Sequence, residues 1–245
     1  MYEIDYLPRF RESEADGLVS TKGYFYYFQD IAAGLYHEMG KGNNKLPQKY
    51  GVSWVYSKYK LKIYEKTDFD HMIHIATWVS KLDAVRSLQE MRITRGEELL
   101  CEGRLESCVV DMKHKKIERL ARIELPDDLA EGNPTSVEPF TRRLKPSENL
   151  EYRYTHTIEY TDIDLSRHMN NLHYIDMFMN AFDLDFYDRF FITDFEIHYI
   201  NQAYYHEELR IYCERIGDEY RLFAFNQDDA VAAACIIKVK PYETA

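Results

Sequence analysis

Apolar residues recur every three or four positions in two separate stretches of the chain. The first stretch carries Tyr24, Phe28, Ile31, Ala32, Leu35 and Met39, and Gly40 follows it. The second stretch carries Leu172, Ile175, Met179 and Phe182. This spacing places apolar side chains on one face of a helix, and glycine commonly stands just past a helix end. We therefore predict one amphipathic helix in each half of the chain.

Alternating apolar and polar residues predict strands around both helices. In the first half the strand-like ranges are Met1–Phe10, Val52–Tyr64, His71–Lys81, Val85–Thr94 and Leu99–Met112. In the second half they are Tyr152–Tyr160, Ile192–Ile200, Glu208–Arg215, Tyr220–Asn226 and Ala230–Lys240. Each half thus combines a helix with a meandering antiparallel sheet, which is the α+β class.

A polar stretch rich in proline separates the two halves. It contains Pro126, Gly132, Pro134, Pro139 and Pro146. Such composition is typical of a linker. We predict an N-terminal domain at residues 1–125, a linker at 126–147 and a C-terminal domain at 148–245, and a length of 245 residues suits two domains of ordinary size.

The run Asp162 to Asn171, DIDLSRHMNN, lies at the entrance of the second predicted helix. Within it an acid, a hydroxyl and an imidazole alternate, at Asp164, Ser166 and His168. Free main-chain N–H groups and the positive end of the helix dipole gather at a helix entrance, where they can hold a developing oxyanion. One interpretation is a catalytic corner, and the other is a capped helix with a histidine that bonds only locally.

The two halves have matching element orders, which favours an internal duplication. Laid without gaps, Asp16–Tyr26 falls on Asp164–Tyr174. In this alignment Asp16 pairs with Asp164, and Ser20 occupies the place of His168.

Composition narrows the function classes. Net charge is −11, which argues against nucleic acid as the main partner. Four cysteines without a CxxC pair predict neither disulfides nor a zinc site, and the histidines also lack metal-ligand spacing. No phosphate loop, nucleophile elbow or dinucleotide fingerprint is present, so we expect no cofactor. With neither an export signal nor a membrane-spanning window, a cytoplasmic location is expected.

Three lysines alternate with apolar residues near the start of the first sheet, at Lys58, Lys60 and Lys62. A strand there would present all three lysines on one face. Such a face is usually only solvated, but it would also suit an acidic partner.

The segment Tyr160 to Ile175, YTDIDLSRHMNNLHYI, resembles the signature of acyl-acyl carrier protein (acyl-ACP) thioesterases. In the first half, Phe25–Ala33 and Gly51–Val55 resemble that family's N-terminal domain. The resemblance covers the whole length of the chain. It implies two tandem hotdog domains, each with a long helix against a curved antiparallel sheet and an acyl chain between helix and sheet.

The resemblance also implies a catalytic set, consisting of an Asp, an Asn two residues on, a His after two more, and a Glu on a later strand. Asp164 and His168 match this pattern, and Ser166 stands where Asn is expected. Aligning the later strand places Gln202 at the Glu position and Ala203 at a position that is often Cys. If that alignment slips, a neighbouring glutamate, Glu207 or Glu208, would supply the carboxylate.

On this reading Asp164 orients or charges the site, and His168 acts as base or contacts the attacking water. Main-chain N–H groups near Asn170 and Asn171 face the oxyanion. Gln202 cannot accept a proton but can position water, and Ser166 acts through a bridging water. Asp176, farther along the helix, is a secondary candidate. The acyl-pocket candidates are Tyr24, Phe28, Met39 and Trp54.

The function expected from the resemblance is hydrolysis of fatty acyl-ACP to free fatty acid and holo-ACP, within fatty acid biosynthesis. The alternatives are a non-catalytic acyl-binding or regulatory hotdog protein, favoured by Ser166 and Gln202, and an acyl-coenzyme A thioesterase. The expected partner is acyl carrier protein. Association into a homodimer would use outer surfaces and stays open.

Overall fold

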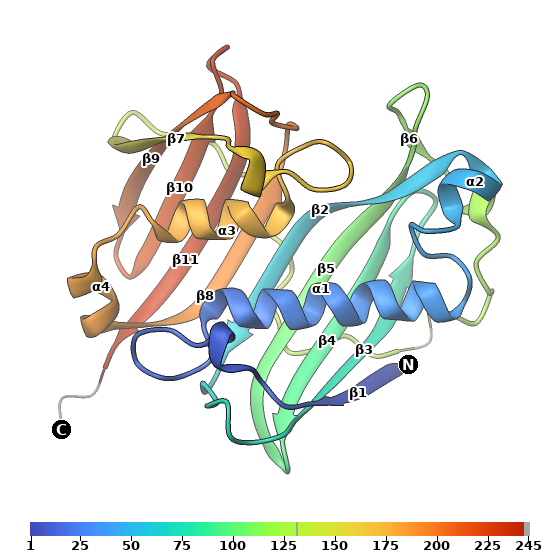
Figure 1. Cartoon of the computed structure of the whole chain (residues 1–245), viewed down its shortest axis with the longest axis horizontal. Helices are drawn as coiled ribbons and strands as arrows, with labels where there is room; N and C mark the ends of the chain where they lie inside the picture. Colours follow the sequence, from blue (N-terminus) through green and yellow to red (C-terminus); the bar gives the residue numbers. More distant parts are fainter. Residues whose placement is uncertain (131, 243–245) are drawn as a thin grey trace. The chain divides into compact units, whose positions relative to one another are not determined.

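The structure is a computed structural model that describes residues 1–130 and 132–242. Position 131, in the predicted linker, and positions 243–245, at the end of the predicted C-terminal domain, lie outside the described residues. The chain divides into two units, Met1–Glu138 (unit 1) and Pro139–Ala245 (unit 2). Each unit combines helices with antiparallel strands (Figure 1), so the predicted α+β class is confirmed.

Unit 1 has the strand order β1-β3-β4-β5-β2, with β6 paired to β5. All of these pairs are antiparallel. Its strands are β1 (Tyr2–Tyr6), β2 (Val52–Ile63), β3 (Ile73–Leu82), β4 (Ser87–Arg95), β5 (Glu98–Asp111) and β6 (Ile117–Glu118). Its helices are η1 (Phe10–Glu12), α1 (Thr21–Glu38), α2 (Leu46–Tyr50) and η2 (Leu120–Ile123). Figure 1 shows α1 lying across this sheet.

Unit 2 has the strand order β8-β11-β10-β9-β7, again with antiparallel pairs. Its strands are β7 (Glu151–Thr157), β8 (Phe190–Tyr199), β9 (Glu208–Ile216), β10 (Glu219–Phe225) and β11 (Val231–Pro241). Its helices are η3 (Tyr160–Asp162), α3 (Asn171–Met179) and α4 (Leu184–Arg189). β1 to β5 and β7 to β11 correspond to the ten predicted strands, whereas α2, α4 and β6 were not predicted.

Helix α1 begins and ends where its sequence indicates. The Ser20 side chain accepts a hydrogen bond from Gly23 N–H at 2.8 Å, and Gly40 has the positive φ of 67° that suits a residue past a helix end. Beneath the helix, the Phe28 ring packs so closely on β5 that a Cβ atom at Gly103 would lie 2.5 Å from it. Glycine at position 103 is therefore needed for α1 to reach the sheet.

Helix α3 is shorter than its apolar stripe. It ends at Met179, although the stripe extends to Phe182. Asp183 caps the next helix, α4, by accepting a hydrogen bond from Phe186 N–H at 2.9 Å. The ring of Phe182 stacks on that of Phe186, with centroids 4.1 Å apart. Phe182 therefore lies in the turn between the two helices and packs against α4.

The turn before the helix has the same main-chain hydrogen bonds in both units. The bond from Ser20 N–H to Glu12 O in unit 1 matches the bond from Asn170 N–H to Asp162 O in unit 2. The bond from Glu14 N–H to Leu18 O likewise matches the bond from Asp164 N–H to His168 O. The helix N-caps Ser20 and Asn170 also correspond, an offset of 150 residues. The duplication therefore extends to individual backbone bonds.

This register corrects the gap-free alignment, which paired Asp16 with Asp164 and is shifted by two residues. The counterpart of His168 is Leu18, not Ser20. The gap-free alignment relied on one shared aspartate. The two N-caps could not guide it, because they are different residue types, Ser20 and Asn170. Unit 1 consequently has no imidazole at this place.

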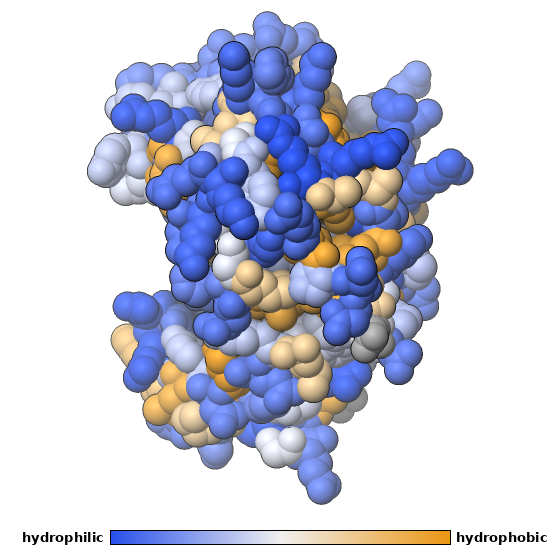
Figure 2. All heavy atoms as spheres, turned by 90° about the vertical axis from the view of Figure 1, so that its right-hand side faces the viewer, coloured by the Kyte–Doolittle hydropathy of each residue, from blue (hydrophilic) through white to orange (hydrophobic). Residues whose placement is uncertain are grey.

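The face shown in Figure 2 is mostly hydrophilic, with smaller hydrophobic patches between the hydrophilic residues. This agrees with a net charge of −11. Among the described residues, no helix is both long and apolar enough to cross a membrane.

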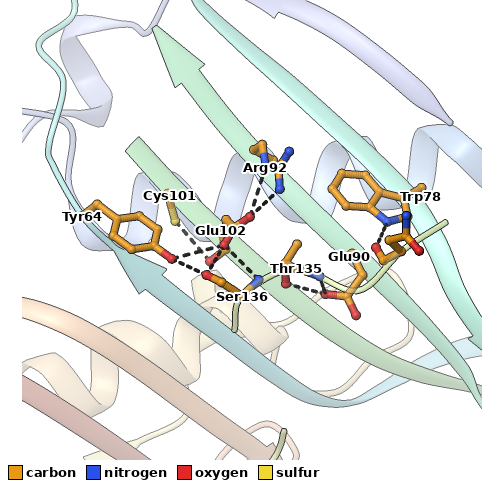
Figure 3. A network of polar contacts seen from close by, with 9 residues as sticks. Tyr64, Trp78, Glu90, Arg92, Cys101, Glu102, Thr135 and Ser136 are labelled. Carbon is orange, nitrogen blue, oxygen red and sulfur yellow. Dashed lines mark hydrogen bonds and ion pairs between the residues drawn. The ribbon is translucent and has the colours of Figure 1, made fainter. Parts of the chain in front are cut away.

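In unit 1, polar residues of the predicted linker bind two buried carboxylates of the sheet (Figure 3). Glu90 on β4 accepts hydrogen bonds from Thr135 N–H at 3.3 Å and from its hydroxyl at 2.6 Å. Glu102 on β5 accepts from Ser136 N–H at 3.1 Å and from its hydroxyl at 2.5 Å. Thr135 and Ser136 thus hold the linker to the sheet, and each residue gives two hydrogen bonds to one carboxylate.

Unit 2 holds its part of the same segment in a similar way. The buried Glu196 of β8 accepts a hydrogen bond from Thr141 N–H at 2.7 Å and faces the Thr141 hydroxyl at 3.3 Å. The Ser147 hydroxyl donates to Glu214 of β9. Serine and threonine in this stretch are therefore partners of buried acids as well as linker residues.

The charge of Glu102 is stabilised in the folded chain. Burial opposes ionisation, but donation from Ser136 and from the Arg92 guanidinium, 2.7 Å away, outweighs burial and lowers the pKa of Glu102. A carboxylate with a lowered pKa contributes stability above the ordinary glutamate pKa of about 4.3, and this contribution is lost as pH falls through the folded-state pKa.

We therefore expect Glu102→Gln to lower the free energy of unfolding by about 1–3 kcal/mol at pH 7, because the linker and Arg92 lose a charged acceptor. The difference from wild type should shrink as pH falls below about 4.3. Urea unfolding at a series of pH values measures both effects. Glu98→Gln is the control, because Glu98 pairs with Arg95 at the surface and should contribute below about 0.5 kcal/mol. Equal stability of Glu102→Gln and wild type at pH 7 would contradict this view.

Candidate active site

The loop of residues 163–170 joins η3 to α3 and is closed by main-chain hydrogen bonds. Asp164 N–H donates to His168 O at 3.0 Å, which closes the tip. Asn170 N–H donates to Asp162 O at 2.8 Å, which closes the base. The structure therefore brings Asp164 and His168, two predicted catalytic residues, to the same loop tip.

The side chains of this loop differ in exposure. Asp164 and His168 are half-buried, whereas Ser166 is exposed. Asp164 Oδ1 accepts a hydrogen bond from Ser166 N–H at 2.7 Å. The main chain of Ser166 thus contacts the Asp164 carboxylate and helps to orient it. The predicted role of the Ser166 hydroxyl, which is to act through a bridging water, stays a prediction.

Gln202 lies on a segment docked beside the loop. The carbonyl of the buried Ala203 accepts a hydrogen bond from Met169 N–H at 2.9 Å. Gln202 itself is exposed, and its Oε1 accepts a hydrogen bond from the Tyr204 hydroxyl at 3.0 Å. The Tyr204 ring also meets the His168 ring edge to face, with centroids 5.5 Å apart.

The sequence interpretation missed Tyr204, which contacts both His168 and Gln202. The available signal was a pair of tyrosines, Tyr204 and Tyr205, directly after the aligned position. Aromatic residues are common throughout this chain, so the pair did not stand out. Only the turn after β8 brings Tyr204 back over the loop.

The helix entrance is partly occupied by the chain's own bonds. Asn170 is the N-cap of α3, and its Oδ1 accepts from Leu172 N–H at 2.9 Å. Its own N–H donates to Asp162 O. The Asn170 N–H is therefore engaged within the loop, and the role of main-chain N–H groups near Asn170 and Asn171 toward an oxyanion stays a prediction.

Below the loop, the carboxylate of the buried Asp162 lies between two imidazoles. His156 Nε2 of β7 is 3.1 Å from Oδ2, and His173 Nδ1 of α3 is 3.4 Å from Oδ1. Glu159 N–H also donates to Oδ2 at 2.9 Å. His173 lies 3.6 Å from Asp176, the secondary catalytic candidate. Asp162 therefore ties the loop to β7 and α3, a role that spacing along the chain does not reveal.

In unit 1, tyrosines take the place of these imidazoles. The Glu12 carboxylate, at the position of Asp162, accepts hydrogen bonds from the hydroxyls of Tyr6 and Tyr27, each at 2.8 Å. Burial and the Glu12 charge raise the pKa of Tyr27. The turn is thus anchored by the same kind of contact in both units, but with different donors.

An ion-pair cluster occupies the unit 1 counterpart of the loop. Val19 N–H donates to Thr67 O, as Met169 N–H does to Ala203 O, so Lys66 corresponds to Gln202. Lys66 Nζ is 2.7 Å from Glu14 and 2.9 Å from Asp16, and its side chain is 6% exposed. Burial opposes the Lys66 charge, but both carboxylates outweigh it and raise its pKa.

The four acyl-pocket candidates do not form one group. Tyr24 and Phe28 are fully buried in the N-terminal half of α1, where the Tyr24 hydroxyl accepts from Thr67 N–H at 3.0 Å. Met39 and Trp54 belong to a separate cluster at the other end of the helix, where Trp54 stacks on Tyr36 with centroids 4.3 Å apart. Their role in holding an acyl chain stays a prediction.

Neither a metal centre nor a thiol nucleophile is apparent in the described part of the chain. No group of three His, Cys, Asp or Glu side chains there is arranged to hold a metal ion. The four cysteines, Cys101, Cys108, Cys213 and Cys235, are free and buried. Burial raises the pKa of each thiol, which disfavours the reactive thiolate.

Two family models match the chain. The model of the acyl-ACP thioesterase N-terminal domain matches residues 1–129, and that of the acyl-ACP thioesterase C-terminal domain matches residues 145–238. A comparison with curated proteins found no significant match.

Two solved structures share the fold over nearly the full length. An acyl-ACP thioesterase from Bacteroides thetaiotaomicron has a TM-score of 0.87 at 18% identity and covers 97% of both chains. The 12:0-ACP thioesterase from Umbellularia californica has a TM-score of 0.83 at 13% identity, covering 98% of this chain and 97% of its own. At such identities these similarities show the fold, not the site residues.

We expect Asp162→Asn to loosen the loop, because an amide group presents N–H donors to the imidazole and main-chain donors around it. The free energy of unfolding should fall by about 1–3 kcal/mol. Amide hydrogen exchange at Asn170, whose N–H closes the loop, should become faster. Asp188→Asn, which changes an exposed carboxylate on α4, is the control and should leave both quantities unchanged. Unaltered exchange at Asn170 in Asp162→Asn would mean that Asp162 does not anchor the loop.

Proposed function

The chain belongs to the acyl-ACP thioesterase family, and we propose that the 163–170 loop with Gln202 and Tyr204 carries out its hydrolysis of fatty acyl-ACP to free fatty acid and holo-ACP. The observation that carries this proposal is the closed loop that joins Asp164 and His168, with the Gln202 segment bonded alongside it. An acid, an imidazole and an amide thereby lie on two segments of unit 2 that are hydrogen-bonded to each other.

The groups present suit thioester hydrolysis. A thiolate leaves without a strong acid, so the reaction needs mainly an activated water and a stabilised oxyanion. His168 is the proposed base that takes the proton from water. Asp164, oriented by Ser166 N–H, supplies the negative charge that favours the imidazolium formed.

The chemistry is assigned to unit 2 because the corresponding corner of unit 1 lacks an acid–base group of the right kind. Leu18 stands at the His168 position, and the carboxylates of Glu14 and Asp16 are paired with Lys66. We assign the acyl-pocket role to unit 1, through Tyr24, Phe28, Met39 and Trp54.

The partner in this proposal is acyl carrier protein, and the compartment is a reducing cytosol. Four free, buried cysteines support the second statement. A homodimer stays a prediction.

We expect purified protein to release free thiol from acyl-ACP, and His168→Ala to lower kcat by about 100-fold or more, the usual contribution of a positioned base. The measurement is thiol release from acyl-ACP with short, medium and long acyl chains, beside matched acyl-coenzyme A substrates. His37→Ala, which changes an exposed histidine on α1, is the control and should retain wild-type turnover.

The alternatives give different results in the same assay. Tight binding of acyl-ACP without thiol release would indicate a non-catalytic acyl-binding protein. Faster release from acyl-coenzyme A would indicate a coenzyme A thioesterase. Full turnover by His168→Ala would exclude His168 as the base.

A further inference from the structure

Gln202 stands where the family resemblance calls for a glutamate, and it changes what that position can do. A glutamate carboxylate accepts hydrogen bonds and can take a proton from water, whereas an amide cannot act as base but can donate. The contacts around Gln202 determine whether its oxygen or its NH₂ group is available to a substrate.

We propose that Tyr204 holds the Gln202 side chain so that its NH₂ group donates a hydrogen bond to the carbonyl oxygen of the bound thioester. This inference rests on the proposed function and assigns Gln202 to oxyanion stabilisation and Tyr204 to positioning. In this chain, position 202 would then stabilise negative charge, whereas a glutamate at the same position would accept a proton.

The first argument is the hydrogen bond between the two side chains. The Tyr204 hydroxyl donates to Gln202 Oε1 at 3.0 Å. An amide has one oxygen acceptor and two N–H donors. With the oxygen bonded to Tyr204, the donors are the groups that Gln202 offers to a substrate.

The second argument is that Tyr204 itself is held in place. Its main-chain N–H donates to Glu207 Oε2 at 3.0 Å, and its ring meets the His168 ring. The preceding residue, Ala203, is fully buried and bonded to Met169 N–H. The phenol hydroxyl is therefore presented from a fixed backbone beside the proposed base.

The third argument comes from unit 1, where the corresponding residue is Lys66. Its ammonium group reaches the loop carboxylates of Glu14 and Asp16, at 2.7 and 2.9 Å. In unit 1, the residue at this position therefore directs its N–H donors toward the loop. A donor at position 202 agrees with the geometry of the repeat.

The step balances with the groups named. The water oxygen forms a bond to the carbonyl carbon as His168 takes the water proton, and the π electrons move to the carbonyl oxygen, which accepts from Gln202 N–H. The carbonyl then re-forms, the carbon–sulfur bond breaks, and the imidazolium returns its proton to the departing thiolate. The products are a carboxylic acid and a free thiol.

The decisive variant is Gln202→Glu, which introduces the residue that the family resemblance expects. If Gln202 acts as a donor, a carboxylate here removes the donor and adds negative charge beside the oxyanion. We expect kcat to fall by about 100-fold at pH 8, the usual effect of losing one oxyanion donor, with KM changed little. Because Gln202 is exposed, thermal unfolding should match wild type and confirm folding.

Tyr204→Phe tests the positioning role, since it removes the hydroxyl and keeps the ring on His168. We expect kcat to fall by about fivefold, as for loss of one neutral hydrogen bond. In a Gln202→Ala background the same change should have no further effect, because the amide to be oriented is gone. Tyr205→Phe, at the exposed neighbouring tyrosine, should keep wild-type kcat.

The outcomes separate this inference from the proposed function. Wild-type turnover together with an equal or higher kcat in Gln202→Glu would overturn the donor role while leaving the thioesterase intact. Equal losses from Tyr204→Phe in the wild-type and Gln202→Ala backgrounds would overturn the positioning role. A wild-type protein without thiol release would overturn the proposed function and this inference with it.

Discussion

A carboxylate removed from water must be surrounded by hydrogen-bond donors, and this requirement determines how the connecting segments of the chain are held. Glu90 and Glu102 each take a main-chain and a hydroxyl donor from one residue of the linker. Glu196 binds the next part of that linker, and Asp162 meets the same requirement beneath the 163–170 loop. Buried acids thus order segments whose composition alone suggests simple connections.

The repeated turn shows what duplication preserves and what it leaves free to change. Main-chain bonds are the same in both units, since each peptide group needs a partner whatever side chain it bears. The side chains diverge: one acid is anchored by tyrosines, and the other by His156 and His173. At the left-handed turn position Gly17, with φ of 77°, is matched by Arg167, with φ of 64°. A non-glycine residue there costs roughly 1–2 kcal/mol, and such strain tends to persist at functional loops.

The spacing of apolar residues was enough to predict the ten main strands and the two main helices, because buried and exposed positions alternate regularly along each of them. Helix ends were harder to predict: α3 ends at Met179, and Asp183 caps the start of α4, which no count of apolar residues reveals. Asp164 and His168 could be predicted as site candidates because they lie close together in sequence. Tyr204 and the imidazoles around Asp162 were missed, since only the folded turn and sheet bring them to the loop.

Charge balance distinguishes the two corners chemically. In unit 1 the buried ammonium group of Lys66 pairs with the carboxylates of Glu14 and Asp16. These ion pairs hold the turn to the segment that carries Lys66. In unit 2 the lysine position carries the neutral Gln202, and an imidazole is added at His168. If this corner carries out hydrolysis as proposed, a carboxylate at position 202 would add a negative charge where negative charge develops in the reaction. In the mechanism we propose, the neutral amide of Gln202 avoids that repulsion and leaves proton transfer to His168.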